Sequence, residues 1–191
     1  MARAEPSRHG GAHPEDEDAM TPPRLLALID VDGVLNPYGA PACPPGYTEH
    51  ELFEGEQVRV DPTHGALLRR LVPHFDLVWA TGWEQDANRL LAPLLGLPEL
   101  PLVEFPPHPG RNYDKFPEVA RAVGDRPAAW LDDLHSEAAC TWAAGRREPT
   151  RLVPVDPGVG LLEEHIDEML RFAREFGTAV RGRSGSAASP E

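Results

Sequence analysis

The sequence is poor in cysteine, in positive charge and in long apolar segments. Its two cysteines, Cys43 and Cys140, show no metal-ligand spacing and no disulfide framework, so we expect two free thiols in a reducing compartment. Acidic residues outnumber basic ones by 31 to 18, a net charge of −13 that argues against nucleic acid as partner while leaving room for a local basic patch. No apolar run reaches the roughly 18 residues of a membrane span, and no secretory signal opens the chain. We expect a cytoplasmic protein without membrane contact.

Large apolar side chains are also scarce at both ends of the chain. Residues 1–23 and 177–191 cannot bury enough apolar surface to offset the entropy of ordering, so the sequence predicts a disordered acidic tail and a second disordered tail. Residues 24–176 are then predicted to form one domain.

The most informative stretch begins with five consecutive apolar residues, Leu25–Ile29, followed by Asp30, Val31, Asp32 and Gly33. An uninterrupted apolar run predicts a strand buried on both faces. Alternate strand residues point the same way, so the two acids face one pocket at the strand end. Ligands bind at the carboxyl ends of strands in open parallel sheets, which favours a metal and phosphate centre here.

Two other interpretations of this stretch stay open at this point. The acids could be solvated turn residues, or a metal-binding DxD of the glycosyltransferase type. An EF-hand loop is disfavoured, because residues 34–41 supply none of its further oxygen ligands.

Strands and helices alternate along the rest of the chain. The alternation predicts an α/β fold, a three-layer sandwich around a five-stranded, mostly parallel Rossmann-like sheet. Residues 47–60, with Glu54 and Gly55 between two strand-like stretches, predict a small β-hairpin flap over the mouth of the site. The predicted strands are 25–29, 75–80, 101–105, 128–131 and 151–155, and the predicted helices are 62–72, 84–95, 113–123, 136–144 and 161–176.

Polar side chains follow three of the predicted strands. Besides Asp30 and Asp32, these are Thr81 with Gly82, and the pair Asp132-Asp133. Right-handed crossovers place the carboxyl ends of parallel strands on one edge, so all three groups are expected to converge. Several carboxylates at one edge repel each other unless a cation lies between them, and oxygen ligands of this kind suit Mg²⁺.

Lys115 is the only lysine among the 18 basic residues. A compact ammonium pairs with phosphate oxygens and carboxylates as a point charge, which a planar guanidinium does not reproduce. The alternative is chance retention at the first turn of a helix. Thr81 offers a hydroxyl to a phosphate or, alternatively, simply caps the following helix. Trp83 is either a stacking platform for a substrate ring or a structural aromatic.

The order of these residues resembles the four motifs of the haloacid dehalogenase (HAD) superfamily: the Asp30-Val31-Asp32-Gly33 motif, then Thr81, then Lys115, then Asp132-Asp133. The resemblance spans nearly the whole folded region. Asn36-Pro37 and the runs 79–84 and 130–133 are similar to small HAD domains related to bacterial RNA-repair proteins.

The resemblance implies a Mg²⁺-dependent phosphohydrolase that works through an aspartyl-phosphate. Asp30 would be the nucleophile, and Asp32 the general acid and then the base that activates water. Thr81 would bond the transferring group, and Lys115 would neutralise its oxygens. The residues implied to bind the phosphate or substrate are Thr81, Gly82, Lys115, Asn36 and Trp83.

The resemblance also implies a Mg²⁺ site. Its ligands would be Asp30, Asp132 and the backbone carbonyl of Asp32, and Asp133 would assist or position a water.

The chain provides no large cap between the motifs, so we expect an open site. Such a site suits a phosphorylated substrate that can be macromolecular, or else it needs a partner to close it. The alternative function is a catalytically silent phosphate-binding or interaction module in a repair or regulatory assembly. A response-regulator receiver is disfavoured, because its lysine comes last, whereas Lys115 precedes Asp132.

Overall fold

The computed structural model describes residues 24–106 and 113–185, with side chains in the last helix described to residue 176. The elements form an α/β fold built on a four-stranded parallel sheet in the order β4-β1-β5-β6, with a separate two-stranded hairpin, β2-β3. The strands are β1 Leu25–Ile29, β2 Thr48–Phe53, β3 Glu56–Val60, β4 Phe75–Trp79, β5 Ala128–Asp132 and β6 Thr150–Pro154. The helices are α1 His64–Arg69, α2 Ala92–Leu95, α3 Phe116–Val123, α4 Glu137–Gly145 and α5 Glu163–Gly185, with a π-helical segment η1 Ala87–Leu91 before α2.

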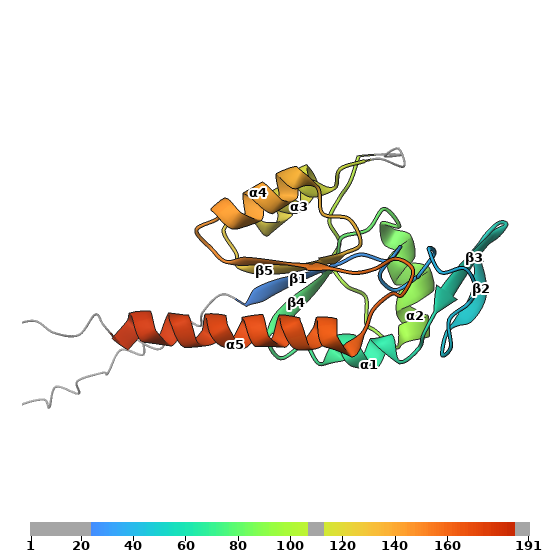
Figure 1. The fold of residues 1–191 in the computed structure, drawn as a ribbon, viewed down its shortest axis with the longest axis horizontal. Helices are drawn as coiled ribbons and strands as arrows, with labels where there is room; N and C mark the ends of the chain where they lie inside the picture. The colour runs from blue at the N-terminus through green and yellow to red at the C-terminus, as the bar shows by residue number, and fades with distance from the viewer. Residues whose placement is uncertain (1–23, 107–112, 186–191) are drawn as a thin grey trace, which may run out of the picture.

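The central strand β1 is buried on both faces, as the apolar run predicts. Its odd-numbered side chains, such as Ala27 and Ile29, join the apolar cluster that includes α1, α2 and α5. Its even-numbered side chains, Leu26 and Leu28, join the cluster that includes α3 and α4. Figure 1 shows the resulting three layers, with α3 and α4 on one side of the sheet and α1 and α5 on the other.

The third of the five predicted strands, 101–105, is wrong, because the structure has no strand there. Only Leu102 makes a bridge to β4, where the Trp79 N–H donates to the Pro101 carbonyl and the Val103 N–H donates to the Trp79 carbonyl. Pro101 has no N–H to extend the pairing, and Pro98 and Pro106 lie close on either side. The segment therefore touches the edge of β4 without joining the sheet.

Two predicted helices differ in detail from the structure. The helix predicted for 84–95 contains the π-helical segment η1, which ends two residues before Pro93. In a regular α-helix the ring of Pro93 would clash with the carbonyl of Arg89. The last helix, α5, does not end near Phe176 but continues to Gly185. Extending an existing helix adds one hydrogen bond per residue ordered, which is far easier than nucleation. The predicted tail 1–23 lies outside the described residues.

The predicted hairpin is confirmed and lies at the carboxyl edge of the sheet (Figure 1). Gly55 at its turn has a φ of 75°, a conformation that glycine adopts without strain. Arg59 on β3 ties the hairpin to the loop after β1, because its guanidinium donates to the carbonyls of Pro37 and Ala40 at 3.2 and 2.8 Å. No described helix is long and apolar enough to cross a membrane.

Candidate active site

Asp30 and Asp32 stand where β1 ends, and the intervening Val31 turns back into the core. Asp30 is almost fully buried, at 3 % exposure, while Asp32 is partly exposed. The chain reverses immediately afterwards, since the Gly33 N–H donates to the Asn36 carbonyl at 2.8 Å. Gly33 has a φ of 79°, which a side chain rarely tolerates. The two predicted acids therefore lie together at the end of β1, with Asp30 buried and Asp32 partly exposed.

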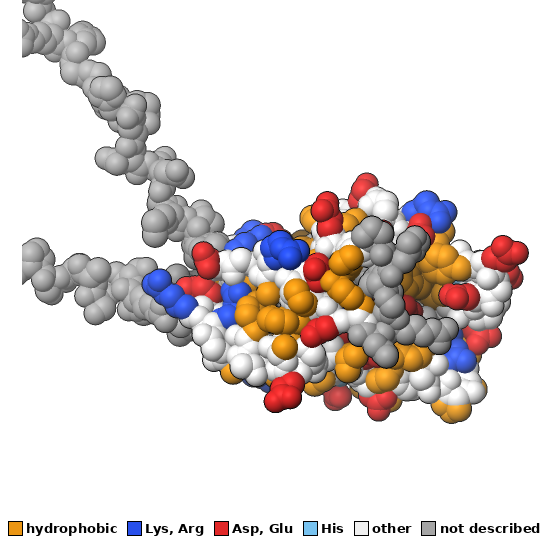
Figure 2. Space-filling view, turned by 90° about the horizontal axis from the view of Figure 1, so that it is seen from above, with side chains coloured by type: hydrophobic (Ala, Val, Ile, Leu, Met, Phe, Trp, Pro, Cys, Tyr) orange, Lys and Arg blue, Asp and Glu red, His pale blue; other side chains and the backbone are white. Residues whose placement is uncertain are grey.

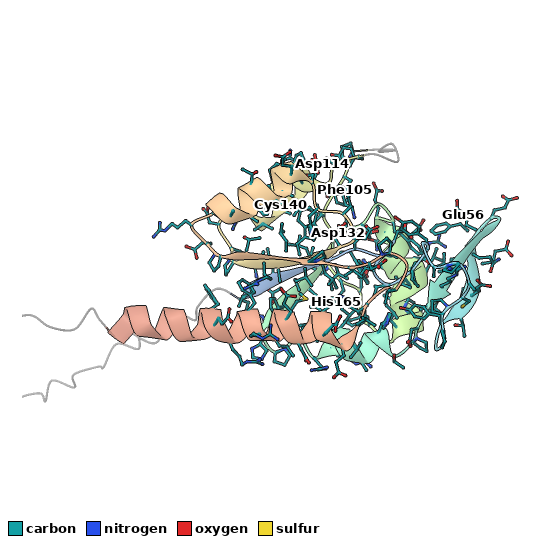
Figure 3. All side chains as sticks on the ribbon, in the orientation of Figure 1. Glu56, Phe105, Asp114, Asp132, Cys140 and His165 are labelled. Carbon is teal, nitrogen blue, oxygen red and sulfur yellow. The ribbon has the colours of Figure 1, made fainter. Side chains whose placement is uncertain are left out.

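Asp132 is the last residue of β5, the strand beside β1, and is completely buried. Figure 3 labels it at this end of the sheet. The indole N–H of Trp130 donates to its Oδ2 at 3.0 Å, and the Leu134 backbone N–H donates to its Oδ1 at 3.0 Å. Bonds of this kind hold the carboxylate in one orientation.

Asp133 packs directly over the turn that follows β1. A Cβ added to Gly33 would lie only 2.4 Å from the Asp133 carboxyl carbon, so this contact requires glycine. The Tyr38 hydroxyl donates to Asp133 Oδ2 at 2.9 Å, although the tyrosine side chain is largely exposed. The turn after β1 and the acid after β5 thus hold each other in place.

Lys115 directly precedes α3 and points its ammonium between two acids of the sheet edge. Its Nζ lies 2.5 Å from Asp30 Oδ2 and 2.7 Å from Asp132 Oδ2. The sequence prediction that this lysine meets the strand-end carboxylates is confirmed by these contacts. The ammonium compensates for only part of the negative charge around it.

The electrostatics of the site follow from burial and this uneven charge balance. Burial raises the pKa of Asp30 to about 8, an effect that Lys115 opposes and Asp132 reinforces. Burial alone would lower the pKa of Lys115, but the two acids more than offset this and raise it. Burial also raises the pKa of Asp133, against the hydrogen bond from Tyr38. Additional positive charge at this place would favour the ionised carboxylates.

Three carboxylates of the site can offer oxygen atoms to one cation. Asp30, Asp132 and Asp133 each have a carboxylate oxygen within 4.8 Å of the others. When all three carboxylates are ionised beside one ammonium, the net charge is −2, which a divalent cation balances. Oxygen ligands at this edge fit Mg²⁺ or Mn²⁺ better than metals that prefer nitrogen or sulfur. The side chain of Asp32 is not part of this set.

Both carboxylate oxygens of Asp32 are instead held by neighbouring side chains. The Asn36 amide donates to Oδ1 at 2.8 Å, and the Trp83 indole N–H donates to Oδ2 at 2.9 Å. The sequence predicted Asn36 and Trp83 as phosphate or substrate contacts. The structure shows both oriented toward Asp32, and their contact with a phosphate stays a prediction, as does a metal bond from the Asp32 carbonyl.

Thr81 and Gly82 follow β4, the other neighbour of β1. Thr81 is buried, and its Oγ1 accepts from the Trp83 backbone N–H at 3.3 Å, so its own hydroxyl hydrogen is available to another acceptor. Gly82 is exposed with open space around it. Both residues lie at the carboxyl edge of the sheet, as the sequence predicts. That they bind a phosphate stays a prediction.

Sequence reasoning missed Tyr38 and Trp130 as partners of the acids. Trp130 stands two residues before Asp132 on the same strand, so the two side chains lie on the same face. The two-residue period of a strand could therefore have indicated this contact. Tyr38 lies in a loop, and no periodicity indicates where its hydroxyl points.

A comparison with protein families matches residues 26–166 to the HAD domain in Swiss Army Knife RNA repair proteins. The chain belongs to this HAD family. The match covers all four groups of site residues, from Asp30 to Asp133. Neither the comparison with curated proteins nor that with solved structures found a match. Membership in the HAD family supports a hydrolase of the phosphoesterase type and agrees with the acid cluster at the sheet edge.

Proposed function

We propose that this chain is a Mg²⁺-dependent phosphohydrolase that forms an aspartyl-phosphate on Asp30. The observation that carries the proposal is the ammonium of Lys115 between Asp30 and Asp132, inside a cluster of three carboxylates. A purely structural ion pair needs one acid for one base, and this excess of buried acids favours a site that takes up a cation and a phosphate.

The residues fit a magnesium ion. Asp30, Asp132 and Asp133 would hold it, and Mg²⁺ characteristically completes its coordination with water and substrate phosphate. When bound, the ion neutralises charge on the phosphoryl oxygens and stabilises the ionised form of Asp30.

Asp30 supplies the nucleophile for the first step. One of its carboxylate oxygens forms a bond to phosphorus while the bond from phosphorus to the leaving oxygen breaks. Asp32, at the opening of the site, donates a proton to the leaving oxygen. Lys115 and the Thr81 hydroxyl hold the phosphoryl oxygens, so that charge is stabilised by groups that are already in place.

The second step releases phosphate. Asp32, now ionised, removes a proton from water, and the resulting oxygen attacks phosphorus as the bond to Asp30 breaks. Inorganic phosphate leaves and both acids return to their starting states. One carboxylate thus serves as acid and then as base, which requires that it face both the leaving group and solvent.

The proposed substrate class is a phosphorylated end of a macromolecule. The described residues contain only the hairpin beside the site and no large cap, which suits a bulky substrate. The matching family description names RNA repair proteins, so oligonucleotides with a 3′- or 5′-phosphate are the first substrates to assay, beside phosphopeptides and sugar phosphates.

The test is turnover of an aryl phosphate with Mg²⁺ by the wild type and by Asp30→Asn. We expect phosphate release that EDTA stops and that the variant lacks, while Asp125→Asn, an exposed acid in the loop before β5, retains full activity. Retained turnover in Asp30→Asn would refute the mechanism. Phosphate binding without turnover by the wild type would favour the silent binding module instead.

A further inference from the structure

The two groups that hold Asp32 are themselves held by opposite strands of the hairpin. Asn36, which donates to Asp32 Oδ1, accepts with its own Oδ1 from the Arg59 backbone N–H of β3 at 3.0 Å. Trp83, which donates to Asp32 Oδ2, packs edge to face against Phe53 at the end of β2, with ring centroids 4.9 Å apart.

These contacts connect three segments that lie far apart in the sequence. Trp83 follows β4, Asn36 follows β1, and the hairpin lies between them in the chain. Each oxygen of the carboxylate has one donor, and each donor has one contact on the hairpin. Neither Asn36 nor Trp83 belongs to the acid cluster of the candidate metal site.

The backbone directly after Trp83 has an unusual conformation. Glu84 has a φ of 48°, the only positive φ of a described residue other than glycine. Strain of this kind persists where the surrounding contacts hold it, and it clusters at active sites and ligand clamps. Here it belongs to the turn that presents the indole N–H to Asp32.

We infer that the β2-β3 hairpin positions the Asp32 carboxylate, through Phe53 and Trp83 on one oxygen and through Arg59 and Asn36 on the other. Trp83 and Asn36 are positioning residues in this scheme. The inference rests on the proposed function, in which Asp32 donates the proton to the leaving group. A carboxylate held from both sides keeps one orientation, and small misplacements of a catalytic group cost large factors in rate.

The scheme predicts a particular kinetic signature. A general acid matters most for a leaving group that needs its proton, such as phenolate, and little for p-nitrophenolate, which leaves without one. Trp83→Phe removes the N–H but keeps a ring, and Phe53→Ala keeps Trp83 but removes its support. Both should lower kcat/KM for phenyl phosphate about tenfold more than for p-nitrophenyl phosphate.

Two further variants complete the experiment. Trp142→Phe on α4, where the indole contacts Phe116 and Arg146, is the matched control and should leave the ratio of the two kcat/KM values unchanged. Phe53→Tyr keeps the ring that contacts Trp83, so it should keep the wild-type ratio of the two kcat/KM values. Thermal unfolding and near-UV circular dichroism identify variants that lose activity by unfolding.

The possible outcomes distinguish a failure of the positioning scheme from a failure of the proposed phosphatase function. An equal loss of activity toward both phosphates in folded Trp83→Phe and Phe53→Ala would overturn the positioning scheme and leave the phosphatase intact. Absence of turnover in the wild type would overturn the proposed function and the scheme together. A raised ratio in both variants, with the control unchanged, supports the scheme.

Discussion

The replacement of Lys115 by methionine tests the charge balance on which the site depends. Methionine has nearly the length of lysine but no charge, so Asp30 and Asp132 would face each other without the ammonium that now lies 2.5 and 2.7 Å from them. At an effective dielectric constant of about 20, each contact corresponds to a Coulomb attraction of roughly 6 to 7 kcal/mol.

Desolvation of three charged groups offsets most of that attraction. Removal of one partner from a buried charge pair nevertheless costs about 3–5 kcal/mol, because the remaining charge has no counter-ion. We expect a loss of this size in the free energy of unfolding of Lys115→Met. Lys115→Arg, which keeps the charge but not the shape, should lose less.

The assay is denaturant unfolding in EDTA at about pH 9. In the wild type, the pKa of Asp30, about 8, lies below this pH, and the pKa of Lys115 is raised above its ordinary value, so these two groups are both charged. Mg²⁺ should recover more stability in the variant than in the wild type, because it binds a more negative site.

Arg121→Met on α3 provides the control, since the Arg121 side chain is 74 % exposed and its 3.7 Å ion pair with Glu118 should contribute less than about 1 kcal/mol. If folded Lys115→Met shows the same unfolding midpoint and slope as this control, with no added response to Mg²⁺, the argument from buried charge is wrong.

Three other predictions follow from the structure. In Gly33→Ala the added Cβ would overlap Asp133, so the free energy of unfolding should fall by at least about 1–2 kcal/mol and Mg²⁺ should no longer raise the thermal unfolding temperature. Gly55→Ala, at a similar positive φ, meets no atom within 4 Å and should keep the Mg²⁺ response. Burial lowers the pKa of His64, so the folded state binds fewer protons than the unfolded state, and the free energy of unfolding should fall as the pH drops below about 6.5. His64→Asn should reduce the slope of the free energy of unfolding against pH by up to about 1.4 kcal/mol per pH unit, measured by denaturant titrations at several pH values. Reductive ¹³C-methylation should give a single lysine resonance with a raised pKa, and Asp30→Asn should lower that pKa in an NMR titration.

The layers of the fold could be predicted because β1 is an unbroken apolar run and the helices carry apolar residues at a helical period. An unbroken run such as Leu25–Ile29 has no polar face, so it must lie between two layers. The segment 101–105 also contains large apolar residues, Leu102, Val103 and Phe105, yet strand pairing depends on backbone donors, and Pro101 lacks one. Apolar composition alone does not separate a strand from an extended segment that touches the sheet edge.

The acids of the site could be predicted for a related reason. Parallel strands place their ends on one edge, so Asp30 and Asp132 meet whatever the loops do. The partners of Asp32 could not be predicted in the same way, since Asn36 and Trp83 reach it from loops whose paths follow from tertiary contacts. The sequence therefore predicted the charges of the site better than their orientation.

Lys115 depends on packing that lies outside the sheet edge. It directly precedes α3, whose Val119 and Val123 are buried in the cluster beneath α4, with Trp130 of β5 in the same cluster. The strand supplies Asp132 and the helix supplies the ammonium, so their 2.7 Å contact is only as precise as the docking of α3 on the sheet. Shortening Val119 to alanine should therefore lower the proposed phosphatase activity, measured with an aryl phosphate, as well as the stability. In the proposed chemistry the three-layer architecture would therefore take part, because the sheet provides the acids and the layer of α3 provides the ammonium that they share.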